Sequence, residues 1–404
     1  MHSIYLVKGV VKHYDWGGSQ YLPSLLGRAD RDKPFAEYWM GTHPQGVAQL
    51  ESELGRLIPL TEKLAGLSFL LKVLDVKDML SIQVHPTKAA AQQEFQRENN
   101  AGIPLEAPTR NYKDDNHKPE LMVALSSFWL LHGFKQEQEL RETLTRVQEF
   151  SSLLPIWKEG GNEALYKYVM TLPQNKVDQL LLPLLKRVSL QFKKGELSKS
   201  SPDYWAAKAG EQYCQQGHAD KGIFSIYFFN LVHVNPGEGV FQDAGIPHAY
   251  LEGQNVEVMA NSDNVLRGGL TAKHVDVVEL MKHTRCEGIT PQLIKPQIEE
   301  GPIHWIQTPV ADFKLGVVSI AAGSTKTLPI GEPSFLLCPN GVVELSCGDT
   351  VLTLQQGQIV AFWDGSIPVG LSSAESGTTG GVRMFLARRK GPMGTQNSQY
   401  CASL

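Results

Sequence analysis

The sequence predicts a mainly β protein that is interrupted by one helical insertion. Short apolar runs alternate with glycine and proline turn signals before residue 136 and again from residue 222. Between these two regions, apolar residues recur at helical spacing. The chain has 404 residues, of which 42% are hydrophobic and 20% charged. That composition is typical of a folded protein with two or three domains and excludes general disorder.

The first β region contains two clear strand candidates. SFLLKVLDV at 68–76 predicts a buried strand, and DMLSIQVHP at 78–86 predicts another that ends at Pro86. Turn signals such as DWGG at 15–18 separate the strands of this region.

The middle of the chain is predicted to be helical. Its first segment places Leu140, Leu144 and Val147 on one face of a helix. Pro173 and Pro183 are expected to break a helix or to occupy a first turn. Three further helices are predicted at 162–172, 177–188 and 204–217.

The β pattern resumes at residue 222, and a short helix is predicted at 270–283. The segment 341–365 then contains closely spaced strands and glycine turns, as in a small barrel or jelly roll. By composition, 372–381 is expected to be a flexible loop.

These patterns divide the chain into four parts. Residues 1–135 and 222–295 are predicted to form one discontinuous β domain, which a helical domain at 136–221 interrupts. Residues 296–390 are predicted to form a second β domain, and 391–404 a tail.

Charge and cysteine content exclude several classes of partner. With 38 basic and 42 acidic residues, the net charge of −4 provides no electrostatic footprint for nucleic acid. The longest apolar run, at 222–234, is shorter than the roughly 20 residues that span a bilayer. The five cysteines form no C-x-x-C pair, so neither a disulfide framework nor a thiolate zinc site is predicted. We expect a cytoplasmic monomer without a nucleic-acid or membrane partner.

Three polar segments could carry chemistry. Gln83 and His85 are two residues apart on a predicted strand, so they can face one cavity, although they could also be incidental polar residues. Lys118 and Glu120 have the same spacing before an apolar strand, where a solvated charged turn is the alternative. His248 opens a third segment, PHAYLEGQNVEVMANSDNVLRGGLTAKH, whose polar residues stand among small and apolar ones.

Two histidines and one carboxylate with an open position are typical of a catalytic Zn²⁺ site, and Gln83 would add an unusual neutral ligand. The same set can hold Fe(II) in oxygenases, and the spacing alone does not separate the two metals. No P-loop, G-x-S-x-G or H-E-x-x-H motif is present, so a nucleotide cofactor or a serine nucleophile has no support.

Six motifs resemble those of the type I mannose-6-phosphate isomerase family. The resemblance runs from about residue 5 to about residue 285 in family order, and the last hundred residues share only a barrel-like pattern. The motifs are YDWGG at 14–18, AEYWMGTHP at 36–44, LSIQVHP at 80–86, NHKPE at 116–120, PHAYLEG at 247–253 and EVMANSDNVLRGGLTAKH at 257–274.

The resemblance implies two cupin jelly-roll barrels, an α-helical domain and one zinc ion per chain. It implies that mannose 6-phosphate and fructose 6-phosphate are interconverted by proton transfer through a cis-enediol. The implied zinc ligands are Gln83, His85, Glu120 and His248. The implied active-site residues are Trp16, Ser81, Lys118, Glu257, Asp263, Arg267 and Lys273.

Within that reaction, Arg267 is expected to stabilise the enediolate because its guanidinium is permanently charged. Glu257 is the first choice for the base that moves the proton between C1 and C2, provided that burial raises its pKa. Lys118 and His117 are the rivals, with ring opening as another role for them.

Ser81 and Lys273 are expected to hold the phosphate, through a hydroxyl hydrogen bond and a point charge. No histidine follows His304, so the second barrel is expected to be structural and without metal. Two alternatives stay open: a cupin that binds a sugar phosphate without catalysis, and a non-haem iron cupin oxygenase.

Overall fold

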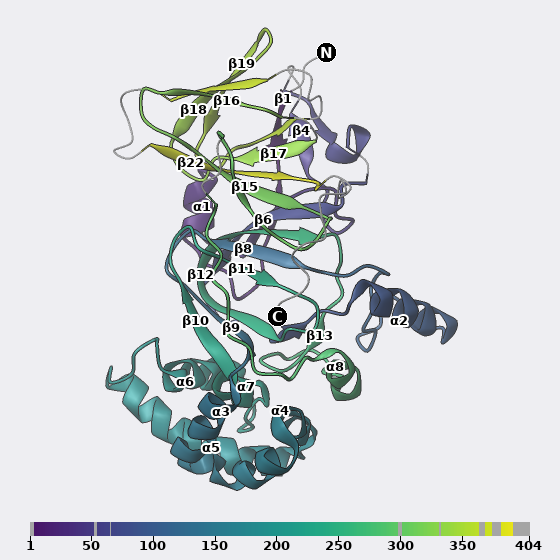
Figure 1. Cartoon of the computed structure of the whole chain (residues 1–404), viewed down its shortest axis with the longest axis vertical. Helices are drawn as coiled ribbons and strands as arrows, with labels where there is room; N and C mark the ends of the chain where they lie inside the picture. The colour runs from purple at the N-terminus through teal and green to yellow at the C-terminus, as the bar shows by residue number, and fades with distance from the viewer. Residues whose placement is uncertain are drawn as a thin grey trace, which may run out of the picture.

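The protein is mainly β, as predicted, and most of its helices lie at one end of the molecule (Figure 1). The predicted tail at 391–404 and most of the predicted loop at 372–381 lie outside the described residues. The computed structural model describes residues 4–51, 55–64, 66–297, 301–330, 333–362, 368–373 and 381–390.

A ten-stranded antiparallel sheet forms the centre of the molecule. Its longest strand, β12, pairs with four others, β6, β7, β8 and β9. All eight residues of β6 are buried, because both faces of this strand are covered. The strands are β2 (Val10–Lys12), β3 (Glu37–Met40), β6 (Phe69–Val76), β7 (Gln83–Val84), β8 (Glu120–Ala124), β9 (Phe128–Phe134), β10 (Phe229–Val234), β11 (Gly239–Gln242), β12 (His248–Ala260) and β13 (Leu266–Arg267).

An eight-stranded and a four-stranded sheet make up the other β part. The eight-stranded sheet consists of β14 (His304–Ile306), β15 (Lys314–Ile320), β22 (Val382–Arg388), β17 (Ser334–Leu337), β20 (Ile359–Phe362), β1 (Ile4–Lys8), β4 (Gln49–Glu51) and β5 (Leu57–Pro59). The four-stranded sheet consists of β16 (Thr325–Leu328), β21 (Val369–Ser372), β18 (Val342–Cys347) and β19 (Thr350–Gln355).

The first strand of the chain belongs to this second part. β1 pairs with β20, with Ile4 opposite Phe362, although the sequence pattern placed residues 1–135 in the first β domain. A strand pattern identifies a strand but not its partner, so the sequence could not reveal that β1 pairs with a strand from the C-terminal part of the chain. Apolar contacts join the two β parts, such as the edge-to-face pair of Phe69 and Phe335 at 5.8 Å between ring centroids.

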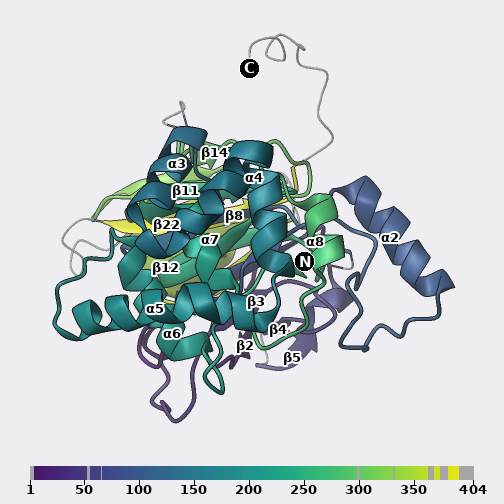
Figure 2. The same ribbon diagram turned by 90° about the horizontal axis from the view of Figure 1, so that it is seen from below.

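The helical insertion covers the end of the ten-stranded sheet, as Figures 1 and 2 show from two sides. Pro173 directly precedes α5, whereas Pro183 lies inside that helix. The elements are α3 (Glu137–Arg146), η2 (Gln148–Leu153), α4 (Leu154–Thr171), α5 (Gln174–Lys193), α6 (Pro202–Tyr213) and α7 (Gly222–Phe228). No helix of the described residues combines the length and apolarity needed to cross a membrane.

Three expectations about these elements were wrong. Strands resume at Phe229 and not at residue 222, because the apolar run there forms α7, a helix buried on every side whose pattern cannot be told from that of a strand. The strand expected at 78–86 is reduced to Gln83–Val84, since side chains of the helical insertion bind the backbone of Met79. The helix expected at 270–283 is α8 (Val277–His283), which begins only after Asp276, whose side chain caps it.

Short helices complete the fold: α1 (Tyr21–Leu25), η1 (Leu60–Glu62) and α2 (Lys88–Asn100). The sequence analysis did not predict α2, which projects from the side of the molecule (Figure 1). The α2 sequence contains few apolar residues, so it has no marked apolar stripe.

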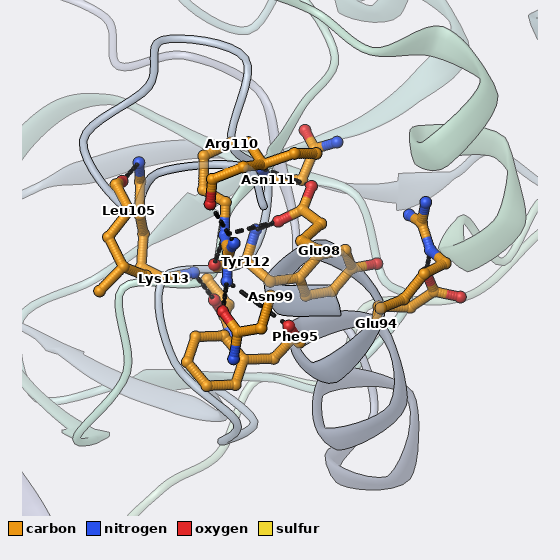
Figure 3. A network of polar contacts seen from close by, with 12 residues as sticks. Glu94, Phe95, Glu98, Asn99, Leu105, Arg110, Asn111, Tyr112 and Lys113 are labelled. Atoms are coloured by element: carbon orange, nitrogen blue, oxygen red, sulfur yellow. Dashed lines mark hydrogen bonds and ion pairs between the residues drawn. The ribbon is translucent and has the colours of Figure 1, made fainter. Parts of the chain in front are cut away.

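A buried ion pair ties α2 to the loop that follows it (Figure 3). The Nε atom of Arg110 lies 2.8 Å from an Oε atom of Glu98, and both side chains are almost completely buried. The same carboxylate accepts hydrogen bonds from the backbone N–H groups of Asn111 and Tyr112. This arrangement sets the course of the chain toward Lys118 and Glu120.

We predict that Glu98→Ala lowers the free energy of unfolding by about 3–5 kcal/mol, because it leaves the Arg110 guanidinium buried and unpaired. Urea denaturation of both proteins measures the change. Arg97→Ala is the matched control, since this more exposed arginine of the same helix should contribute at most about 1 kcal/mol. A loss below about 1 kcal/mol for Glu98→Ala would contradict the importance of the pair.

Candidate metal centre and cavity

Three of the four predicted metal ligands converge inside the central sheet. His85, Glu120 and His248 are buried, and their potential ligand atoms all lie within 4.8 Å of one another. The two Nε2 atoms lie 3.5 Å and 3.4 Å from the two oxygens of the Glu120 carboxylate. Nitrogen and carboxylate donors in this arrangement can hold a divalent cation.

The orientation of both rings fits a metal ion. The Nδ1 atoms of His85 and His248 each lie 2.9 Å from a backbone carbonyl oxygen, of Asn264 and Ile246 respectively. An Nδ1–H group that donates to a carbonyl leaves Nε2 deprotonated and free to bind a metal. The Nε2 atom of His85 is buried and has no hydrogen-bond partner among the described residues, as a metal ligand requires.

The electrostatics of the cluster favour the ligand forms. Burial lowers the pKa of His85 to about 4, so this imidazole is neutral near pH 7. Burial opposes the ionisation of Glu120, but the Lys118 ammonium and the two imidazoles outweigh it and hold the pKa of that carboxylate well below its usual range. The neutral His85 imidazole and the ionised Glu120 carboxylate are the forms that bind a metal ion.

Gln83 completes the predicted ligand set from a neighbouring strand. In the β7–β12 pair, Gln83 lies directly opposite His248, and in the β7–β13 pair it lies opposite Arg267. Its side chain also lines the cavity next to the cluster.

A small inner chamber of about 40 Å³ adjoins the cluster of His85, Glu120 and His248, and Glu257 lies in its wall. The Lys72 Nζ atom is 3.1 Å from Oε1 of Glu257, and the Tyr250 hydroxyl donates to Oε2 at 2.8 Å. Burial raises the pKa of Glu257, although the nearby Lys72 ammonium opposes this effect. Lys118 borders the same chamber and lies 3.1 Å from Glu120.

A larger outer cavity of about 660 Å³ opens beside this chamber, a volume suited to a small ligand. Lys118 and Gln83 line both spaces, so the two spaces meet at these residues. The other predicted site residues in the wall of the outer cavity are Trp16, Ser81, Asp263, Arg267 and Lys273.

Two cations of this wall lack a counter-ion. Within the described residues, neither Arg267 nor Lys273 forms an ion pair. Burial lowers the pKa of the Arg267 guanidinium, and burial followed by repulsion from Arg267 lowers the pKa of Lys273. Unpaired, partly desolvated cations in a cavity are suited to an anionic ligand.

Asp263 is held at the cavity wall by residues that the sequence analysis did not select. The Gln45 side-chain amide donates to its carboxylate at 2.9 Å, and His43 Nε2 lies 3.4 Å away. The Nδ1 atom of His43 accepts from the backbone N–H of Gln45 at 3.2 Å, which leaves Nε2–H to face Asp263. The backbone N–H of Asp263 donates to Asp114 at 2.7 Å.

His117 is the one predicted site residue that lies apart from both the cluster of metal ligands and the two cavity walls. Its Nε2 atom lies 2.9 Å from the carboxylate of Asp312, in the segment before β15, and it borders neither the chamber nor the outer cavity. A residue before Pro119 is restricted to extended backbone, so His117 and its neighbour Lys118 point in different directions.

The structure adds Lys72 and Glu37 to the site, which sequence reasoning missed. Both line the inner chamber and the outer cavity. Glu37 is the only charged residue of β3, and Lys72 shares the otherwise apolar β6 with only one other charged residue, Asp75; all three are buried. A charge in such a run is rarely tolerated without a partner, and this was the available signal.

Comparison with known proteins gives consistent results. The sequence matches the family model described as phosphomannose isomerase type I, catalytic domain, over residues 4–137. It is 33% identical over 374 residues to the mannose-6-phosphate isomerase of Escherichia coli (strain K12), covering 86% of this chain and 92% of that protein. It is 35% identical over 380 residues to the mannose-6-phosphate isomerase of Mus musculus, covering 83% and 86%.

The fold is similar to that of solved structures of mannose-6-phosphate isomerases. One is the crystal structure of mannose 6-phosphate isomerase from Salmonella typhimurium bound to its substrate and a zinc atom. The TM-score is 0.82 at 30% identity, and the alignment covers 96% of this chain and 100% of that chain.

We predict that the metal-free protein loses stability as the pH falls from about 6.5 toward 4. Burial lowers the pKa values of His85 and His132 to about 4 in the folded protein, whereas unfolded histidines titrate near 6.5. The unfolded state therefore binds more protons in this window, at a cost on the order of 3 kcal/mol per histidine. Denaturant titrations at successive pH values measure this slope.

His132→Asn tests one half of the effect. The Nδ1 atom of His132 lies 2.7 Å from Oε1 of Gln242, and an asparagine amide can replace that donor without titrating. The variant should lose about half of the pH dependence, and an unchanged slope would contradict the assignment.

Proposed function

The chain belongs to the type I phosphomannose isomerase family, and from that premise we propose how its residues carry out the reaction. It is a zinc-dependent aldose–ketose isomerase that interconverts mannose 6-phosphate and fructose 6-phosphate. The observation that carries this conclusion is the buried cluster of His85, Glu120 and His248 beside a cavity that contains two unpaired cations.

His85, Glu120 and His248 would hold the zinc ion, with the side-chain carbonyl of Gln83 as the fourth protein ligand. When bound, zinc supplies a Lewis acid or a template for the oxygens at C1 and C2 of the sugar. Lys118, 3.1 Å from Glu120, neutralises the carboxylate on the cavity side.

We propose that Glu257 moves the proton. Its carboxylate takes the proton from C2 of the open-chain mannose 6-phosphate and returns it to C1. The hydroxyl proton passes from O2 to O1, so that the carbonyl shifts from C1 to C2 through a cis-enediol. A raised pKa brings a carboxylate closer to the basicity that this transfer requires. Lys118 is the second candidate for this role, because it borders both the inner chamber and the outer cavity, whereas Glu257 borders only the chamber.

The remaining roles follow from the cavity wall. Arg267 would stabilise the negative charge of the enediolate, since its guanidinium is charged, desolvated and without another partner among the described residues. Lys273 and Ser81 would bind the phosphate, and the indole of Trp16 would cover the sugar. The carboxylate of Asp263 would accept hydrogen bonds from sugar hydroxyls at the wall.

We also propose that the enzyme is a cytoplasmic monomer. Cys214, Cys286 and Cys338 carry free thiols, as is usual in a reducing compartment. The exposed large apolar side chains of the described residues are scattered over separate elements, for example Leu105, Leu190 and Val351, which is normal for a monomer surface.

The first prediction from this function concerns the metal. The purified protein should convert mannose 6-phosphate to fructose 6-phosphate in a coupled assay, lose turnover on chelation and regain it with zinc. Folded, zinc-loaded protein that binds sugar phosphate without turnover would instead indicate a non-catalytic binding protein. Activity that required iron and oxygen would indicate an oxygenase.

The second prediction concerns Arg267. Arg267→Ala should lower kcat by about 10²–10³-fold and change KM far less, because the guanidinium acts on charge that develops in the transition state. Steady-state kinetics at equal zinc content measure both constants. Arg285→Ala is the control, since among the described residues this exposed arginine forms an ion pair only with the exposed Asp243. A rise in KM alone for Arg267→Ala would contradict the proposed role.

A further inference from the structure

The last residues of the helical insertion contact two segments of the outer cavity wall, namely the segment that precedes β7 and the loop that follows β13. Gln212 and Tyr213 at the end of α6, and Gln215 just after it, border the outer cavity themselves. The chain then reaches Asp220, just before α7, where it meets the loop that follows β13. None of these residues was selected from the sequence.

The carboxylate of Asp220 binds three backbone N–H groups at once. Its Oδ1 atom accepts from Gly222 and from Leu270, both at 2.7 Å, and Oδ2 accepts from Thr271 at 3.4 Å. One side chain of the insertion therefore holds two consecutive residues of the loop between Arg267 and Lys273.

The loop backbone is strained where Asp220 holds it. The backbone of Leu270 has a φ of +52°, a conformation that residues other than glycine rarely adopt. Gly269 before it has a φ of +110°. The segment at Gly222 also lies too close to the loop for any side chain at that position, since a Cβ on Gly222 would lie 2.5 Å from the backbone N of Leu270. Such a conformation persists only where surrounding contacts determine it, and functional sites are where it is usually found.

A second set of contacts fixes the neighbouring segment. The Gln212 amide accepts from the backbone N–H of Met79 at 3.2 Å and donates to the carbonyl of Met79 at 3.0 Å. This segment is bonded in turn to the loop, because Ile82 N–H donates to the carbonyl of Gly269 at 3.0 Å. Ser81 therefore lies in a segment that is tied to the insertion and to the loop.

Arg267 and Lys273, the cations at the two ends of this loop, repel each other. Arg267 and Lys273 lie near enough for Arg267 to contribute to the lowered pKa of Lys273, and neither has an ion-pair partner among the described residues. Without an anion in the cavity, this repulsion favours movement of the loop into solvent. The hydrogen bonds of Asp220 to the loop backbone oppose that movement.

We propose that Asp220 is a positioning residue for the anionic end of the substrate. Through Leu270 and Thr271 it keeps Lys273, the cation assigned to the phosphate, in the cavity wall. The inference rests on the proposed function to the extent that this anion is the sugar phosphate. The helical insertion would thus contribute to substrate binding without contacting the metal centre.

The test compares Asp220→Ala and Asp220→Asn with the zinc-loaded wild type. Calorimetric titration with inorganic phosphate measures anion binding, and steady-state kinetics measure KM and kcat for mannose 6-phosphate. Asp220→Ala should raise both the phosphate Kd and KM by at least about tenfold, because all three backbone donors lose their acceptor. Asp220→Asn, which keeps one acceptor oxygen, should lie between, and zinc content should stay that of the wild type.

Asp203→Ala is the matched control for simple destabilisation. This carboxylate of the same insertion accepts from the Tyr227 hydroxyl at 2.7 Å and does not contact the loop. It should lower Tm without changing the phosphate Kd. A phosphate Kd and KM within about twofold of wild type in Asp220→Ala would overturn the proposal, as would equal changes in the control.

The outcomes also separate this inference from the proposed function. If Asp220→Ala does not fold, Asp220→Asn provides the same comparison, with a smaller rise in both constants expected. Phosphate binding that depends on Asp220 in a wild type without isomerase activity would support the positioning role and reject the function. Isomerase activity with phosphate binding that is indifferent to Asp220 would support the function and reject the positioning role.

Discussion

The pairing register of β12 is the constraint on which the site depends. This strand places His248 opposite Gln83 of β7 and Glu257 opposite Lys72 of β6, while its far end runs beside Glu120 of β8. Because side chains alternate between the faces of a strand, a slip by one residue would turn both His248 and Glu257 away from the cavity. The thirteen residues of β12 and its four partner strands make such a slip costly.

Charge is distributed differently in the two spaces that this register creates. In the inner chamber each cation has a carboxylate partner, since Lys72 pairs with Glu257 and Lys118 with Glu120. A buried pair of this kind is costly to break, so it keeps the proposed base in one position. In the outer cavity, Arg267 and Lys273 lack a partner among the described residues. The cations of the chamber are thus paired within the protein, whereas those of the outer cavity are suited to an anion from the substrate.

The sequence revealed the residues with unusual chemistry but few of their supports. The family resemblance is confirmed, and the cluster of His85, Glu120 and His248 lies where the three polar segments predicted a metal site. Spacing could not show that His117 turns toward Asp312, because that contact joins residues far apart in the chain. Nor could it predict that α7 is a helix, since a run that is apolar on all sides has no periodicity. Asp220 was missed because its role exists only through a distant loop.

The measurement that tests the account most directly is zinc K-edge X-ray absorption of the zinc-loaded protein. We expect one zinc per chain with two imidazole nitrogens at about 2.0–2.1 Å, oxygen ligands at about 2.0–2.2 Å and no sulfur near 2.3 Å. In His85→Ala one imidazole should disappear from the spectrum. A sulfur ligand, or two imidazoles retained in that variant, would contradict the assignment of the metal centre and the arrangement of the site built around it.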